Sequence, residues 1–319
     1  MPLKVSASET AYFLGFDGGG TKTDCVLADA NGRVLERSTA GPSNPIRTGY
    51  TKAWFSLSEA ADAVLGRHKI HAGHIQGVCA GLGGAGRTGV ARRATTFFER
   101  SYPNAKVLVT TDLEIALEAA FGAGEGIMLL AGTGSAAFGR DAIGHTARAG
   151  GRGPWFSDEG SAFDIGRRAF QAVALADEHR GPATKLSGRI LGWNEANTWD
   201  ALLEHITKSP DAVFPKTFPL VAELADAGDA VSRDILSASA TSLAQLAASV
   251  AKNLVMVDRE ISIARVGGVY GRSKFFDSAI AAELKKALPR AHLATVEIPP
   301  AEAAVRMAIR LTHAKGNAA

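Results

Sequence analysis

The first stretch of the chain that could do chemistry is an acidic residue followed by three glycines and a threonine: Asp17, Gly18, Gly19, Gly20 and Thr21. Glycine has no Cβ and allows positive φ, so such a turn can direct several backbone N–H groups at one anion, for example a phosphate. The stretch differs from a classical P-loop, because Thr21 stands where that pattern has lysine. The residues therefore predict a phosphate-binding turn of another kind.

A second glycine turn lies further along the chain, at Gly132, Thr133 and Gly134. A P-loop or a dinucleotide loop runs into a helix, whereas both of these turns are followed by another strand-like segment. After the first turn, residues 23–30 and the segment after them are joined by Asn31-Gly32, the strongest short hairpin signal. We therefore expect each glycine turn to connect antiparallel strands.

The elements that position these turns occur twice, in the order strand, glycine turn, strand, turn, strand, which predicts an internal duplication. The first copy continues with expected helices at 51–66 and 89–100 and expected strands at 75–82 and 105–112. In the second copy the strand at 127–131 leads to the glycine turn, a strand up to Arg140, a turn at Ile143-Gly144 and a third strand. Two duplicated α/β lobes, each with a phosphate turn, suggest a nucleotide held in a cleft between them.

The composition is that of an ordinary globular protein with room for two domains: 319 residues, 46% hydrophobic and 21% charged. The net charge of +3 comes from scattered basic residues, so nucleic acid is not an expected partner. No apolar run could span a membrane and the first residues lack the apolar core of a signal peptide, so we expect a cytoplasmic protein. Cys25 and Cys79 have no C-x-x-C spacing, which favours buried, reduced cysteines.

Four segments together resemble the sugar kinase/actin/Hsp70 superfamily, and within it the N-acetylglucosamine kinase and BadF/BadG/BcrA/BcrD ATPase group. They are GFDGGGTKT from Gly15, AGTGS from Ala131, GGRGPWFSDEGSAFDIGRRA from Gly150 and VGGVYGRSKFF from Val266, and the resemblance covers essentially the whole chain. It implies an α/β fold of two RNase H-like (actin-like ATPase) lobes around a central cleft. The implied first lobe is 1–113 plus 300–319, with a final helix packed on it, and the second is 114–299.

The resemblance also implies an activity: an amino-sugar kinase that transfers the γ-phosphoryl group of ATP, with Mg²⁺, to the 6-hydroxyl of N-acetylglucosamine or glucosamine. We expect a homodimer. Asp17 would coordinate Mg²⁺, its alternative being an aspartate that only shapes the turn. Gly267 and Gly268 would lie beside the adenosine, although a plain strand-to-helix turn would look the same. The implied phosphate ligands are Gly18, Gly19, Gly20, Thr21, Gly132, Thr133 and Gly134, and for Thr133 β-propensity alone is an alternative.

The implied sugar side consists of Asn44, Gly83, Gly84, Asp112 and Asp158. Asn44 precedes a proline, which favours extended backbone, and its alternative role is to stabilise its own loop. Asp158 lies just before an expected helix, where the helix dipole alone would favour an acid. Asp112 is implied as the catalytic base that accepts the proton of the 6-hydroxyl. The alternative is that Asp112 only begins a helix, because Thr111 and Glu114 match a capping box.

Three other functions are alternatives to the kinase. The segment Gly81–Gly86 fits the G-x-G-x-x-G pattern of a Rossmann dinucleotide-binding domain. That fold would not explain the two hairpin turns. Asp112 also lies too many residues after Gly86 to be the acidic residue that binds the ribose. An ATPase activator of a 2-hydroxyacyl-CoA dehydratase or benzoyl-CoA reductase needs exposed cysteines for an iron–sulfur cluster, whereas Cys25 and Cys79 fall in expected buried strands. A catalytically silent sugar-binding regulator would be expected to lack an acid such as Asp112.

Overall fold

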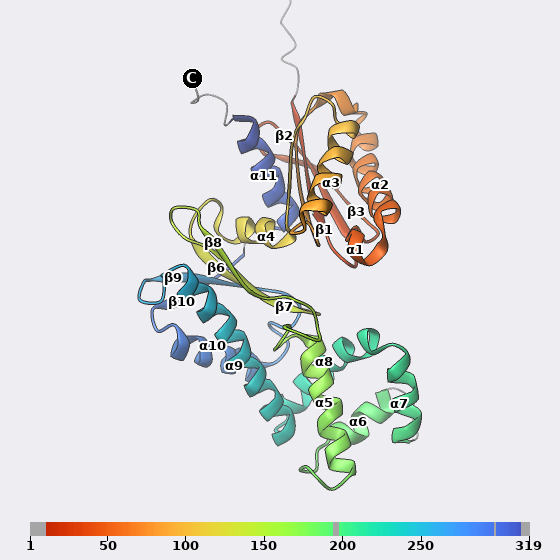
Figure 1. Cartoon of the computed structure of the whole chain (residues 1–319), viewed down its shortest axis with the longest axis vertical. Helices are drawn as coiled ribbons and strands as arrows, with labels where there is room; N and C mark the ends of the chain where they lie inside the picture. Colours follow the sequence, from red (N-terminus) through yellow and green to blue (C-terminus); the bar gives the residue numbers. More distant parts are fainter. Residues whose placement is uncertain (1–10, 194–197, 297, 314–319) are drawn as a thin grey trace, which may run out of the picture. The chain divides into compact units, whose positions relative to one another are not determined.

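The computed structural model describes residues 11–193, 198–296 and 298–313. The chain forms two compact units, Met1–Ala123 with Glu297–Ala319 and Gly124–Val296. Each unit contains one five-stranded sheet covered by helices (Figure 1). The helix that begins at Asp112 belongs to the first unit, so the division falls after Ala123.

The sheet of the first unit begins as an antiparallel meander of β1 (Tyr12–Gly18), β2 (Thr23–Asp29) and β3 (Val34–Ala40). Strands β4 (Ile75–Leu82) and β5 (Lys106–Thr110) then add parallel to β1, which gives the order β3-β2-β1-β4-β5. Gly32 has φ of +77°, as the Asn-Gly hairpin between β2 and β3 requires. The antiparallel return of β2 directly after β1 contradicts the Rossmann alternative, in which a helix follows the first strand.

The sheet of the second unit repeats this arrangement with β6 (Gly126–Ala131), β7 (Ser135–Arg140) and β8 (Thr146–Gly150) as the antiparallel meander. Strands β9 (Ile261–Val266) and β10 (Ala291–Ala294) follow in parallel, in the order β10-β9-β6-β7-β8. Read from its meander edge, this order is the same as that of the first sheet. The predicted internal duplication and the two RNase H-like lobes are therefore confirmed.

The helices of the first unit cover both faces of its sheet. On one face α2 (Tyr50–His68) and α3 (Thr88–Ser101) pack over a core that contains Phe16, Leu57 and Phe98, with the short α1 (Pro45–Thr48) and the 3-10 turn η1 (Ala72–His74) beside them. On the other face α4 (Asp112–Phe121) and α11 (Pro300–His313) pack against β1 and β4. The predicted final helix, expected at about 300–315, thus lies on the first unit, and residues 314 and 315 fall outside the described residues.

Six helices accompany the second sheet: α5 (Ala162–Asp177), α6 (Leu186–Trp193), α7 (Trp199–Lys208), α8 (Pro210–Asp226), α9 (Ala230–Asn253) and α10 (Lys274–Ala287). One large apolar core joins the sheet to all six. The helix after Asp158 turns its apolar residues into this core, and all of these are buried: Ala162, Phe163, Ile165, Ala169 and Phe170. No helix among the described residues is long and apolar enough to cross a membrane.

Candidate active site

The residues singled out in the first unit meet at one edge of its sheet. Strands β1, β4 and β5 run parallel, so their carboxyl ends lie at the same edge. Asp17 lies at the end of β1, Gly83 follows β4, and Asp112 follows β5 after one residue. This is the edge at which open α/β sheets bind ligands.

The first glycine turn is held in a defined shape by backbone hydrogen bonds. Gly19 N donates to Lys22 O at 2.9 Å, and the oxygen of Gly19 accepts from the N–H groups of Ser43 and Asn44, both at 3.0 Å. Gly20 and Thr21 are exposed. The turn therefore fixes its backbone through internal contacts while keeping its tip open to solvent, which suits an anion site.

Two carboxylates face the same region of this edge. Burial, the negative charge of Asp112 and that of Asp24 raise the pKa of Asp17 to about 6, against the opposing charge of Lys22. Two carboxylates that repel each other beside a phosphate turn fit a divalent cation, since Mg²⁺ is commonly bound by one or two carboxylates together with phosphate oxygens. In the described part of the chain no three His, Cys, Asp or Glu side chains gather as a metal cage.

Asp112 is held at the first position of α4 by the predicted capping box. Thr111 is the N-cap, its hydroxyl accepts from the N–H of Glu114, and the Glu114 side chain accepts from the N–H of Thr111. Asp112 Oδ1 accepts from Leu113 N at 3.1 Å, and the side chain is only partly buried. The cap is formed by Thr111 and Glu114 and does not require the Asp112 carboxylate.

Asn44 connects the first glycine turn to the loop after β4. Its backbone is extended, as predicted from the following proline, and its Oδ1 caps α1 by accepting from Ile46 N at 3.0 Å. The loop-stabilising role left open from the sequence is therefore present. A Cβ on Gly83 would lie 2.9 Å from Asn44 Nδ2 and would displace that amide group, and Gly84 has φ of +90°, which favours glycine.

The second unit brings its predicted residues together at the corresponding edge. Gly132 follows β6 and Gly267 follows β9, and a Cβ on Gly267 would lie 2.2 Å from Ala131 O. The oxygen of Gly132 accepts from Ala162 N at 2.8 Å, which ties the Gly132–Gly134 turn to the start of α5. Thr133 and Gly268 are exposed, so the tips of both segments are open.

Asp158 lies in the second unit beside the glycine turn. A Cβ on Gly134 would be 2.9 Å from Asp158 Oδ2, so the carboxylate covers the turn directly. Burial raises the pKa of Asp158, and hydrogen bonds from the backbone N–H groups of Gly153 and Ser135 oppose this shift. Within the second unit, Asp158 therefore lies directly beside Gly134, one of the predicted phosphate ligands.

Two residues at the first turn escaped sequence reasoning. Arg47, in the last turn of α1, lies over Gly20, where an added Cβ would be 3.2 Å from Arg47 NH1. Its exposed guanidinium forms no ion pair within the described residues. Ser43 is fully buried against Gly18, and its hydroxyl oxygen lacks a hydrogen-bond partner among the described atoms. Only proximity to Asn44 in the sequence could have indicated either residue.

The two cysteines do not fit a cluster-bearing activator. Cys25 on β2 and Cys79 on β4 are free and completely buried. Burial raises the pKa of the Cys79 thiol to about 12 and that of Cys25 well above its usual range. Iron–sulfur clusters bind thiolates, so these protonated core thiols are poor ligands.

Comparison with known proteins agrees with this geometry. The sequence pattern of the BadF/BadG/BcrA/BcrD ATPase family matches residues 14–305. The chain belongs to this family. The matched span includes every site residue named above, from Asp17 in the first unit to Gly268 in the second.

Relatives of this BadF/BadG/BcrA/BcrD family member include sugar kinases. The chain is 31% identical to the N-acetylmuramic acid/N-acetylglucosamine kinase of Clostridium acetobutylicum, over 81% of this chain and 85% of that protein. It is 28% identical to the N-acetyl-D-glucosamine kinase of Dictyostelium discoideum, over 93% of this chain and 97% of that protein. A solved structure of a candidate N-acetylglucosamine kinase from Chromobacterium violaceum superposes with a TM-score of 0.74 at 25% identity, covering 94% and 99% of the two chains.

Proposed function

We propose that the protein is an ATP-dependent amino-sugar kinase that transfers the γ-phosphoryl group to the 6-hydroxyl of N-acetylglucosamine or glucosamine. The observation that carries the proposal is the pairing of Asp17 and Asp112 at the carboxyl edge of the first sheet, next to the glycine turn. One carboxylate there serves a metal ion and the other serves an acceptor hydroxyl. The named activities of the relatives support the same reaction.

Phosphoryl transfer depends on positioning and on neutralising charge, because the transition state is loose and spreads charge over the phosphoryl oxygens. The N–H groups of Gly18, Gly19 and Gly20 and the hydroxyl of Thr21 would hold phosphate oxygens. Asp17 would hold Mg²⁺, which when bound neutralises charge on the phosphates. Arg47 would add a fixed positive charge above the turn.

Asp112 would act as the base of the reaction. Its carboxylate accepts the proton of the sugar 6-hydroxyl as that oxygen bonds to the γ-phosphorus and the bond to the β-phosphate oxygen breaks, which releases ADP. The NH₂ group of Asn44 and the backbone of Gly83 and Gly84 would bind neighbouring sugar hydroxyls. Glycine at these two positions leaves room for the sugar to approach the backbone.

The second unit would contribute the other half of the nucleotide site. Gly132, Thr133 and Gly134 are proposed to bind phosphate, and Gly267 and Gly268 to lie against the adenosine. For Asp158 the sugar role inferred from the family remains our proposal. Its contact with Gly134 makes a role at the phosphates a second possibility. In that case Asp158→Asn would raise the KM for ATP and leave the KM for the sugar unchanged.

The deciding experiment is a panel of glucosamine, N-acetylglucosamine, N-acetylmuramic acid and glucose incubated with Mg-ATP and followed by ADP release. We expect turnover with one of the first two sugars and a product whose phosphorus signal couples to the C6 protons. Failure of every sugar, with stoichiometric iron and sulfide in protein prepared without oxygen, would contradict the kinase. Sedimentation of the same sample checks the expected homodimer.

A further inference from the structure

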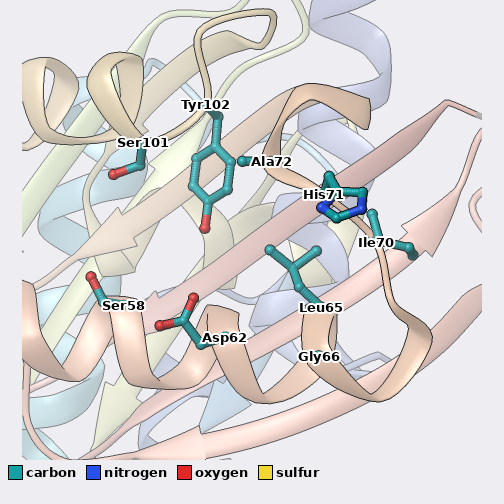
Figure 2. Close-up of a pocket in the computed structure, with 9 residues that line it drawn as sticks. All are labelled: Ser58, Asp62, Leu65, Gly66, Ile70, His71, Ala72, Ser101 and Tyr102. Carbon is teal, nitrogen blue, oxygen red and sulfur yellow. The ribbon is translucent and has the colours of Figure 1, made fainter.

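The first unit contains a hollow of about 430 Å³ that the proposed kinase reaction does not use. Its polar lining comes from α2 (Ser58 and Asp62), from the end of α3 and the residue after it (Ser101 and Tyr102), and from His71 before η1 (Figure 2). Leu65 adds an apolar wall. This volume falls in the range of small-molecule sites.

The hollow lies away from the candidate active site. His71 precedes β4 and Tyr102 precedes β5, so both residues lie where these parallel strands begin. Asp17, Gly83 and Asp112 lie where the parallel strands end. The strands separate the two sites, and a ligand in the hollow is therefore a second ligand.

Tyr102 is the residue that points to a ligand. Its side chain is 6% exposed, and Figure 2 shows the hydroxyl directed into the hollow toward Asp62. The ring is packed in the core while the hydroxyl opens onto the hollow, where no hydrogen bond from another described residue occupies it, so it is available to a ligand or to water. Phenylalanine would fill the same core space, so packing alone does not explain the hydroxyl.

The charge of the lining selects the class of ligand. Asp62 carries the only carboxylate of the lining, and no lysine or arginine is present there. Asp62 also forms no ion pair within the described residues. An anion would be repelled by this carboxylate, and an apolar molecule would displace water from the Tyr102 hydroxyl without replacing its hydrogen bond. A molecule that combines an ammonium group with hydroxyls satisfies both groups.

We propose that this hollow binds a small hydroxylated amine, such as an amino sugar with a free ammonium group. The ammonium group pairs with Asp62, and ligand hydroxyls bond to Tyr102 and Ser58. The apolar face of the ligand rests on Leu65. This proposal does not depend on the kinase assignment, because the hollow shares no residue with the candidate active site.

The test is a titration of ¹⁵N-labelled protein with glucosamine, followed by the amide signals of Ser58, Asp62, Ala72 and Ser101. We expect these signals to shift together with glucosamine. Tyr102→Phe should weaken the response about tenfold, as for one lost hydrogen bond to a polar ligand. Asp62→Asn should weaken it by a few-fold, since it removes the exposed charge that pairs with the ammonium group.

N-acetylglucosamine is the matched control, because acetylation removes the positive charge and keeps the hydroxyls. It should leave the four hollow signals in place, and whichever of the two sugars is the kinase substrate should shift the amides around Asp112. Four signals that stay unchanged with excess glucosamine overturn the proposal, and so does an equal response to both sugars. Shifted hollow signals together with an Asp112 region that neither sugar perturbs would instead contradict only the proposed kinase site.

Discussion

At the scale of single residues, a substitution of Asp112 can distinguish a catalytic role from helix capping. Thr111 and Glu114 form the cap, so Asp112→Asn should leave the free energy of unfolding within about 1 kcal/mol. Asparagine cannot accept the proton, and loss of a positioned base costs on the order of 10²–10⁴ in rate. We expect folded protein that binds ATP and sugar but turns over at least about 100-fold more slowly.

The matched control is Glu114→Ala, which breaks the cap and spares the base. It should lower the free energy of unfolding by about 1 kcal/mol and leave kcat nearly unchanged. Steady-state kinetics and urea denaturation on both variants give the comparison. Near-normal turnover of Asp112→Asn would leave only the capping role for this residue.

The charge on Asp17 should make the free energy of unfolding depend on pH. Its pKa is raised to about 6 from 3.8, so the folded protein binds this proton more tightly than the unfolded chain. The favourable contribution is complete below pH 3.8 and is lost as the pH rises through about 6. Asp17→Asn should therefore raise the free energy of unfolding by on the order of 2–3 kcal/mol at pH 8 and have little effect at pH 4.

Melting curves in EDTA at the two pH values measure this difference without bound metal. The variant should also lack kinase activity, because a neutral amide is a poor Mg²⁺ ligand. A stability change of the same size at both pH values would contradict the assigned charge effect.

Substitution of Arg47 should weaken nucleotide binding and leave sugar binding almost unchanged. Its guanidinium lies over the Gly20 end of the phosphate turn, and a charge-assisted hydrogen bond is worth about 1.5–3 kcal/mol. Because Arg47 is exposed, we expect Arg47→Ala to raise the KM for ATP by roughly tenfold, at the lower end of that range. The KM for the sugar should change little. Arg33, at the hairpin on the opposite edge of the sheet, is the control and should be neutral when changed to alanine.

At the scale of elements, α11 approaches the first sheet closely because β1 carries Gly15. A Cβ on Gly15 would lie 2.2 Å from Ala301 O and 2.6 Å from Val305 N. Gly15→Ala should destabilise the protein by about 1–3 kcal/mol, since the backbone of α11 must move. A Cβ on Gly66 in α2 would meet no atom within 4 Å, so Gly66→Ala should be neutral or should stabilise the protein by up to about 1 kcal/mol. Urea denaturation of the two variants compares these outcomes, and equal stability would contradict the close packing.

The sequence predicted most of these elements because their signals are local. Apolar runs ended by glycine turns marked β1, β6 and the strands after them, and the Asn31-Gly32 dipeptide marked the first hairpin. Strand β5 is shorter than predicted, since Thr111 caps α4 and Asp112 already belongs to that helix. The repeated strand order then followed from the repeated motifs, and both sheets have it.

The remaining parts of the site depend on contacts between distant residues, which no local pattern encodes. Arg47 is an exposed arginine on a four-residue helix, and only the fold places it over Gly20. Asp158 was assigned through the family, and its contact with Gly134 emerges only from the structure. The hollow beside Tyr102 combines one side of α2 with the ends of two other segments.

At the scale of the whole molecule, the two units differ in how the chain builds them. The second unit is a single continuous stretch, and its buried core contains residues of that unit only. Residues 124–296 expressed alone should therefore unfold cooperatively on heating, with retained helical and strand signals in circular dichroism. Residues 1–123 alone lack α11, leaving Phe13 and Ile115 without their cover, and should aggregate or melt at a much lower temperature. A stable, monomeric 1–123 fragment would contradict this dependence on α11.

The position of α11 at the far end of the chain also sets an order of assembly during translation. The strands of the first sheet leave the ribosome early, but the helix that covers one face of that sheet is synthesised after the entire second unit. That apolar face stays open while residues 124–296 emerge and fold, which makes the nascent first unit a substrate for chaperones that bind exposed hydrophobic surface. The unit whose synthesis begins first is thus the last to be completed.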